Sequence, residues 1–352
     1  MAYTTIDDPS VYFQTTIYTG TGSEQAITHG GNSDLQADWV WIKRRDAANN
    51  HRLTDVVRGA TKEIYSDLAD AEDTQAQGLK SFASDGFTLG TNAGYNADGG
   101  TYASWNWKAG TSFTNDASST SVGTIDSVGS VNTDAGFSIQ TWTGTGSGGT
   151  IAHGLGAVPG FMIVKNRTDG SRNWPVYFGD RTKYMYLSST DAQADAGTII
   201  WNNTTPTSTV FSVGNDNGVN ESGKNYVGYV FAEKKGFSKT GSYIGNGSVD
   251  GSFVYTGFKP AFILQKNTAR AGAGWGMFDS TRTPFNVSKG MLIASSAAVE
   301  DTGNAPRVDF LSNGFKWRTT DNWFNDSGAA TIFMAFAENP FVTSTGVPTT
   351  AR

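Results

Sequence analysis

The sequence predicts an all-β protein made of three tandem homologous β-sandwich domains of jelly-roll-like form. A turn followed by an aromatic strand occurs three times along the chain, and internal repeats of this kind decide the fold before other signals do. Apolar residues in the repeated strands recur with period two, which is typical of a sheet. The 43 glycines among many Ser, Thr, Asn and Asp residues favour turns over helix interiors.

The closing segment of each repeat is the clearest copy. The segments read YNADGGTYASWNWKAG from Tyr95, VNESGKNYVGYVFAEKKG from Val219 and FNDSGAATIFMAFAENP from Phe324. Each opens with Asx-Gly turn chemistry. The equivalent strands are expected at Tyr102–Trp107, Tyr226–Phe231 and Thr331–Phe336. One face of each strand is apolar in all three copies, so we assign that face to the core.

The front of each repeat joins a glycine-rich turn to an apolar strand. FQTTIYTGTG, FSIQTWTGTG and FSKTGSYIGNG are followed by WVWIK, FMIVK and FILQK, which end at Lys43, Lys165 and Lys266. These lysine-closed strands are apolar on both faces, which fits the middle of a sandwich or a subunit contact. The copies lie roughly 100 residues apart, which is the size of a small domain and not of a solenoid repeat.

These repeats set the expected domain boundaries. The expected organisation is a first β-sandwich repeat at 1–115, a Ser/Thr/Gly linker at 116–133, a second repeat at 134–234, a third repeat at 235–342 and a flexible tail at 343–352. Gly, Ser and Thr make such linkers flexible and polar. Helical content should be small. Its best candidate is Thr61–Gln77, whose apolar positions keep a helical stripe for about two turns.

Composition excludes several classes of function. The 352 residues carry a net charge of −6, which does not favour a nucleic-acid partner. The chain has no cysteine, so a disulfide, a thiolate metal site and a cysteine nucleophile are excluded. No stretch approaches the roughly 18 apolar residues of a membrane span, so we expect no membrane insertion. The first residues, MAYTTIDDPSVYF, lack the pattern of a secretory signal peptide.

No residue pattern points to catalysis, a metal or a cofactor. His29 and His153 occupy equivalent places in ITHG and IAHG, but one histidine per repeat falls short of the three or four ligands of a zinc site. The Asx-rich stretch 215–217 lacks calcium-loop spacing and leaves only a weak calcium site open. A glycosidase needs a recurring pair of carboxylates. The acid pairs present are not shared by the repeats: Asp7-Asp8, Glu72-Asp73 and Asp191…Asp195. We therefore expect a protein that is not an enzyme.

Two tryptophans beside turns are the candidates for a ligand site. Trp201 lies in IIWNNTTPTSTVFSVG and Trp323 lies in TTDNWFNDSG. An aromatic ring can stack on the C–H groups of a sugar, although most aromatic residues at strand period belong to a core. We predict that Trp201 and Trp323 face a sugar ligand.

A set of motifs in the middle repeat carries a family resemblance. They are GFSIQTWTGTG, HGLGAVP, FMIVKNR and WNNTTPTSTVFSVG, followed by a closing N-x-S-G-x-x-Y-V-x-Y-x-F-A. This combination resembles the repeated β-sandwich domain of bacteriophage tail-fibre and related virion proteins, which is common in marine phages. DVVRGATK and SFASDGFTLG in the first repeat are similar too, and the resemblance covers about residues 9–342. The third repeat departs most, because it lacks the HGLG turn.

The resemblance implies structure and adhesion and brings no catalytic residues. We expect a virion protein, assembled in the cytoplasm of the bacterial host, that acts as a tail-fibre or tail-tip adhesin and holds a host surface glycan. Its expected partners are further copies in a homo-oligomer, a trimer as is usual for tail fibres, and other tail or virion proteins. The first repeat is the expected anchor on the particle. The alternative is a non-adhesive virion part, such as a capsid decoration or a tail adaptor.

Overall fold

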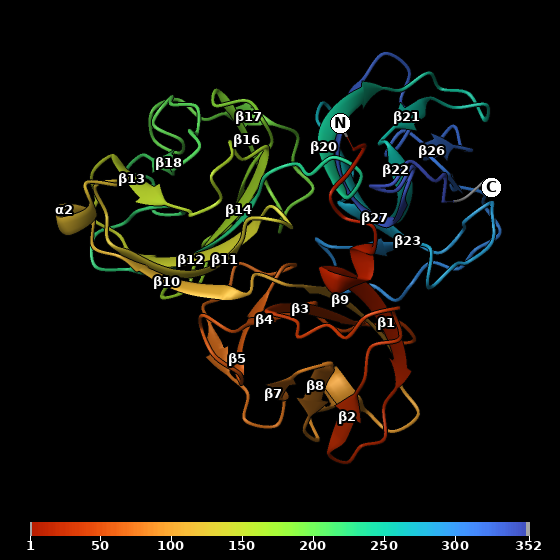
Figure 1. The fold of residues 1–352 in the computed structure, drawn as a ribbon, viewed down its shortest axis with the longest axis horizontal. Helices are drawn as coiled ribbons and strands as arrows, with labels where there is room; N and C mark the ends of the chain where they lie inside the picture. Colours follow the sequence, from red (N-terminus) through yellow and green to blue (C-terminus); the bar gives the residue numbers. More distant parts are fainter. Residues whose placement is uncertain (1, 350–352) are drawn as a thin grey trace.

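The chain forms three lobes around a common centre (Figure 1). The computed structural model describes residues 2–349. Strands make up 41 % of the chain and helices 3 %, so the predicted all-β class is confirmed. The same strand order recurs in the large antiparallel sheet of each lobe: β1-β9-β3-β4-β5, β12-β19-β14-β15-β16 and β20-β27-β22-β23-β24. The expected repeated strands correspond to β9, β19 and β27.

The first lobe, residues 2–110, packs its large sheet against a small sheet of order β2-β8-β7. The strands are β1 Phe13–Thr19, β2 Gln25–Ile27, β3 Trp39–Arg44, β4 Arg52–Asp55, β5 Lys62–Tyr65, β6 Asp73–Thr74, β7 Leu79–Ala83, β8 Gly86–Leu89 and β9 Thr101–Trp107. A single 3₁₀ turn, η1 Pro9–Val11, precedes β1, and a one-turn helix, α1 Ala93–Asn96, precedes β9.

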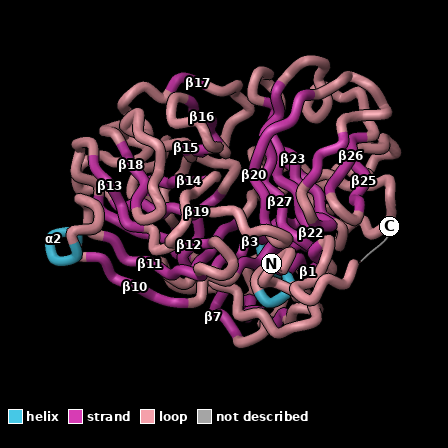
Figure 2. The backbone as a smooth tube through the Cα atoms, turned by 45° about the horizontal axis from the view of Figure 1, so that its top comes forward, coloured by secondary structure: helices cyan, strands magenta, loops and turns pink. Residues whose placement is uncertain are grey.

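The second lobe spans 111–234 and the third lobe spans 235–349 (Figures 1 and 2). The second lobe contains β10 Thr111–Asn115, α2 Ala117–Thr120, β11 Ser127–Asn132, β12 Phe137–Thr143, β13 Gly149–Ala152, β14 Phe161–Asn166, β15 Pro175–Tyr177, β16 Lys183–Tyr186, β17 Ala194–Asp195, β18 Val210–Val213 and β19 Asn225–Phe231. The third lobe contains β20 Ser238–Ile244, β21 Phe253–Tyr255, β22 Phe258–Asn267, β23 Gly276–Asp279, β24 Leu292–Ile293, β25 Val308–Leu311, β26 Gly314–Trp317 and β27 Ala330–Pro340.

Three segments differ from the sequence expectation. The expected linker at 116–133 is ordered: α2 and β11 lie within it, and β11 joins the sheet of the second lobe beside β12. The helical candidate Thr61–Gln77 instead forms β5, β6 and turns, because its backbone pairs with β4. In the expected tail, Ser344 donates hydrogen bonds to Asp7, so this part is attached to the N-terminal segment. Residues 350–352 of the tail lie outside the described residues.

The lysine-closed strands are apolar on both faces because each face contacts a different core. In β3, Val40 and Ile42 pack inside the first lobe, between its two sheets. Trp39 and Trp41 point the other way, into a cluster that draws residues from all three lobes, here called the shared core. A period-two strand buried on both faces reads as continuously apolar. The lobes are therefore parts of one folded body, and not three separate sandwiches.

The aromatic residues that close the repeats meet in the shared core. The ring of Phe336 lies 5.7 Å from Trp107 and 5.8 Å from Phe231, centroid to centroid, and both contacts are edge-on. Trp39 of the first lobe stacks on Tyr229 of the second at 4.3 Å. Such aromatic pairs contribute about 0.5–1.5 kcal/mol each beyond their buried area. The strand face that the sequence assigns to the core is thus the face that joins the lobes.

The opposite face of the closing strands is buried as well. In the first lobe this face carries Ser104 and Asn106, and neither is exposed to solvent. Asn106 Nδ2 donates to the backbone oxygen of Gln14 at 3.0 Å. Gln14 lies directly opposite Asn106 on the neighbouring strand β1. This polar face of the first lobe is thus closed to solvent, and the Oδ1 of Asn106 is buried there without a described hydrogen-bond partner.

The lysines that end the apolar strands link the lobes in a ring. Lys43 Nζ donates to Ala297 O of the third lobe at 3.2 Å, and Lys165 Nζ donates to Ala69 O of the first lobe at 2.8 Å. Lys266 Nζ donates to Thr190 O of the second lobe at 3.2 Å. All three lysines are fully buried. Burial lowers the pKa of Lys165 to about 7. Each lysine thus fixes its lobe to the next one in a head-to-tail order.

The TGTG motif is explained by its contact with the closing turn. A Cβ added to Gly144 would lie 2.2 Å from Glu221 O, and Gly146 has a φ of +75°, which favours glycine. Asn220 is fully buried and accepts from Thr145 N at 2.9 Å while Nδ2 donates to Gly214 O at 2.9 Å. Asn96 and Asn325 make the same bonds in their lobes. The repeated Asn and Gly residues therefore close each sandwich.

Buried ion pairs join two of the three lobe interfaces. Arg58 donates to Asp55 at 2.5 Å with both side chains fully buried, and Tyr229 of the second lobe donates to the same carboxylate at 2.7 Å. At the next interface Arg282 pairs with Asp279 at 2.5 Å, and Trp105 of the first lobe donates to Asp279 at 3.1 Å.

The third interface lacks this ion pair. Phe178 occupies the position that corresponds to Asp55 and packs against the shared core, which also contains Met334, the residue that corresponds to Tyr229. Arg181, three residues after Phe178, is exposed. Apolar residues thus stand at both positions in this interface, where the other two interfaces have a buried ion pair and its hydrogen-bond donor.

We predict that Arg58→Ala lowers the free energy of unfolding by about 3–5 kcal/mol, because it leaves Asp55 buried and unpaired. The matched control Arg181→Ala should change it by less than about 0.5 kcal/mol, as is usual for exposed positions. Urea unfolding of both variants measures the difference. Equal losses in the two variants would show that the buried pair does not hold the first and second lobes together.

Candidate functional site: a cleft beside strand β1

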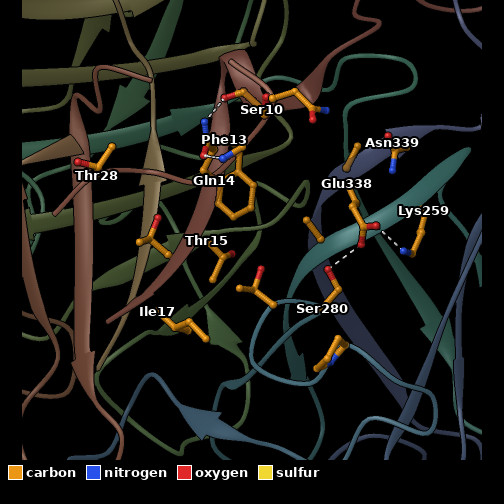
Figure 3. Close-up of a pocket in the computed structure, with 18 residues that line it drawn as sticks. Ser10, Phe13, Gln14, Thr15, Ile17, Thr28, Lys259, Ser280, Glu338 and Asn339 are labelled. Carbon is orange, nitrogen blue, oxygen red and sulfur yellow. Dashed lines mark hydrogen bonds and ion pairs between the residues drawn. The ribbon is translucent and has the colours of Figure 1, made fainter. Parts of the chain in front are cut away.

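A cleft lies between the first and third lobes (Figure 3). Its volume is about 660 Å³, within the roughly 300–1,000 Å³ range of ligand clefts. One wall is the edge of β1 from Phe13 to Ile17, with Thr28 behind it. The other wall comes from the third lobe and includes Lys259, Ser280 and Glu338. Hydroxyl and amide groups dominate the near wall, and the far wall combines the Lys259 and Glu338 charges with small apolar and polar residues.

The polar side chains of the far wall are already paired with each other. Lys259 forms an ion pair with Glu338, and Ser280 Oγ donates to the other carboxylate oxygen at 2.8 Å. On the near wall, Gln14 donates to Ser33 O at 2.8 Å and so holds the loop beside β1. These groups shape the cleft and leave little charge free in it.

The edge of β1 is the part of the cleft that is open to a partner. In the ladder with β9, Gly20 N donates to Gly100 O at 2.8 Å. Bonded residues alternate along an antiparallel pair, so the N–H and C=O groups of Thr15 and Ile17 point away from β9. No described residue bonds to these backbone groups. The Thr15 hydroxyl is also buried without a hydrogen-bond partner, and Ile17 is 46 % exposed.

The two tryptophans predicted to face a sugar lie elsewhere. Trp201 is only 1 % exposed, because its ring packs against Tyr177 inside the second lobe and its indole N–H donates to Lys183 O at 3.1 Å. The prediction for Trp201 is therefore wrong. Trp323 is half-buried against Phe324, and part of its ring stays accessible. The ligand role of Trp323 stays a prediction.

The histidines are built into the sandwiches. Nδ1 of His153 accepts from Leu155 N at 3.2 Å, and its Nε2 lies 3.2 Å from Thr207 O. His29 Nδ1 lies 2.8 Å from Thr16 Oγ1. Within residues 2–349 no group of three or more His, Asp or Glu side chains could hold a metal ion. The same part of the chain has no helix that is long and apolar enough to cross a bilayer.

The acidic pairs named from the sequence are separated by their partners. Both oxygens of Glu72 accept from Arg167, and one also accepts from Arg58. Asp8 accepts from Ser10 and Ser33. These carboxylates hold turns and a lobe interface. The cleft itself was missed by the sequence reading, because its walls come from segments that are far apart in the chain, residues 10–32 and 259–339.

Burial lowers the pKa of His153 to about 4, well below its value in an unfolded chain. The unfolded state therefore binds this proton between pH 6.5 and pH 4 while the folded state does not, so stability falls as the pH falls through that window. We predict that His153→Gln reduces this loss, which amounts to roughly 3 kcal/mol at most for one histidine. Urea unfolding at pH 7 and pH 4.5 measures it. Identical pH slopes in both proteins would contradict the assignment.

Comparison with known proteins gives one family match. No curated protein and no solved structure matches the chain. The family model described as "Domain of unknown function (DUF7483)" matches residues 8–340, which include all three lobes and both walls of the cleft. The match treats the three repeats as a single unit, in keeping with the shared core. The chain therefore belongs to the family Domain of unknown function (DUF7483).

Proposed function

We propose that the protein is a structural component of a bacteriophage virion, in the tail fibre or tail tip, that attaches to the bacterial surface without catalysis. The observation that supports this most is the arrangement of three like lobes around a shared core, because it gives a single chain the threefold form that is usual for tail fibres. The resemblance of GFSIQTWTGTG and the following motifs to tail-fibre domains points the same way.

The site chemistry agrees with a binding role. The cleft beside β1 presents hydroxyl and amide groups, and its one ion pair is already satisfied. The buried histidines are engaged with backbone and a threonine hydroxyl, and carboxylates such as Glu72 are engaged with arginines. A surface of this kind can hold a glycan or a polypeptide by hydrogen bonds.

Self-association is a separate part of the proposal. Self-association was expected because strands such as Trp39–Lys43 are apolar on both faces, and the trimer was expected from the family resemblance. Both faces are covered within one chain, one by the sandwich and one by the shared core. Those strands therefore give no reason to require a second copy, and the homotrimer stays a prediction that light scattering can measure.

The alternative is a non-adhesive virion part, such as a capsid decoration or a tail adaptor. The open edge of β1 supports this alternative, because an unpaired strand edge can pair with an extended segment of another virion protein. Localisation on the particle separates the two. Labelled antibody bound at the tail tip supports the adhesin, and label on the capsid supports the decoration protein.

We predict that the purified protein binds host cells and releases no reducing ends from host polysaccharide. Trp323→Ala should weaken cell binding about tenfold, the loss of roughly 1.4 kcal/mol expected for one stacking ring. Phe253→Ala is the control, because Phe253 is an exposed aromatic residue of β21, a different element. Fluorescence of labelled protein on cells measures binding. Absence of binding by the intact protein would refute the adhesin, and unchanged binding by Trp323→Ala would remove Trp323 from the site.

A further inference from the structure

We propose that the free edge of β1 binds an extended segment of a partner polypeptide as an added antiparallel strand. The inference rests on the proposed non-catalytic binding function and names the class of partner for the cleft. Strand addition of this kind obtains affinity from main-chain hydrogen bonds and specificity from pockets for alternate side chains. The three lobes of the chain offer three versions of the same edge, and the comparison of these versions carries the inference.

The second lobe shows the edge in its occupied form. There β11 pairs antiparallel with β12 over six residues, with Ser130 opposite Ile139 and Val128 opposite Thr141. β12 corresponds to β1, because Phe137 pairs with Phe231 as Phe13 pairs with Trp107. The edge that corresponds to β1 thus accepts a strand in this same protein.

The third lobe shows the edge in a closed form. Thr240 N of β20 donates to Glu233 Oε1 at 2.9 Å, and Ser238 N donates to Lys234 O at 2.8 Å. The C=O of Ile244 accepts from Ser252 Oγ at 2.7 Å. Side chains and a tight turn therefore occupy outward groups near both ends of β20, whereas those of Ser242 between them have no described partner. Natural sheets block their edges with such devices to prevent pairing with another chain.

The first lobe has no covering strand, and a side chain blocks β1 only at its end. The sequence of β1, FQTTIYT, contains no charge and no proline, and its pairing with β9 has no bulge over seven residues. Of its outward carbonyls, that of Thr19 accepts from Gln25 Nε2 at 3.1 Å, whereas the outward groups of Thr15 and Ile17 have no described partner. A long, flat and uncharged edge is a ready site for strand pairing.

The cleft defines what the occupant is like. The walls from the third lobe, with Lys259 and Glu338, stand opposite β1 and confine the space to about 660 Å³. That volume suits a short single segment more than the edge of a second sheet, so a second copy of the chain is the less suitable partner. The occupant of the corresponding edge, β11, reads SVGSVN and is uncharged. We therefore infer a short, uncharged segment of alternating small and β-branched residues.

Correspondence with β11 also gives the register. If a bound segment pairs with β1 in the register in which β11 pairs with β12, its residue at the position of Ser130 lies opposite Thr15. Its residue at the position of Val128 then lies opposite Ile17. Those two positions would exchange both backbone hydrogen bonds with β1, because the outward groups of β1 belong to its odd-numbered residues. The positions of Ser127 and Gly129 would turn their backbone groups away from β1.

The test uses the full chain and a fluorescent peptide with the sequence of residues 127–133, SVGSVNT. Two further peptides each carry two backbone N-methyl groups. The first has them at the positions of Val128 and Ser130, and the second has them at the positions of Ser127 and Gly129. We expect saturable binding of the unmodified peptide, a loss of at least about tenfold for the first methylated peptide and less than about threefold for the second. Equal affinities of the two methylated peptides would overturn the proposal, as would no binding of the unmodified peptide at millimolar concentration.

Protein variants give an independent readout. Ile17→Lys places a charge on the open edge and should abolish peptide binding, whereas Ile244→Lys on the closed edge of β20 should leave it unchanged; both residues are exposed, so both variants should fold. A dimer of the protein that Ile17→Lys abolishes would overturn the proposal in favour of a second copy. The assay contains no cells. A protein that captures the peptide and fails to bind cells therefore refutes the proposed adhesin and leaves the strand site intact.

Discussion

Burial of the inner faces of three sheets against one another is the interaction on which the rest of the structure depends. Trp39, Phe231 and Phe336 come from three different lobes and lie in one cluster. Removing a large aromatic side chain from such a cluster costs about 3–5 kcal/mol, so the shared core contributes strongly to the stability of every lobe. The strands that carry these residues have a second apolar face inside their own lobe, which is why the sequence reads as apolar on both sides.

The same arrangement fixes the order of the lobes. Each of the buried lysines donates to a backbone carbonyl of the next lobe. Two interfaces add a buried ion pair whose carboxylate also accepts a hydrogen bond from a side chain of the neighbouring lobe. Groups of this kind are costly to bury unless every partner is present. The ring therefore favours one arrangement of the lobes and leaves the outward edge of β1, at the first lobe, without a covering strand. The proposed binding function depends on this edge staying open while its counterparts are covered or blocked.

The sequence predicted the parts of the fold that depend on local pattern. Period two and the Asx-Gly turns placed β9, β19 and β27, and the core assignment of Trp107, Phe231 and Phe336 is confirmed. Residues 116–133 were taken for a linker because their Ser, Thr and Gly content resembles one, but pairing of β11 with β12 overrides composition. In the third lobe, Ser238 and not Phe237 pairs opposite Phe336, a shift that the motif alignment could not show.

The functional site was less predictable, because it depends on contacts between distant segments. Trp201 was expected to be accessible because it lies beside a turn. Its ring is covered by Tyr177 of β15, and the local sequence pattern does not indicate that this strand packs against it. The cleft joins β1 to the end of β27, and nothing in either segment alone marks it. The sequence signal that could have identified the open edge is the absence of two features. β1 has no preceding strand that corresponds to β11, and it lacks the charged residues found around β20.

The central claim is that the lobes fold only as one body, and the most direct measurement is the folding of the isolated segment 111–234. This segment contains every strand of the second lobe and exposes Phe137, Tyr229 and Phe231 when the other lobes are absent. The account predicts that it shows no cooperative unfolding transition by circular dichroism as a monomer. A monomeric fragment with native β content and a sharp transition in urea would contradict the claim and restore the picture of three independent sandwiches.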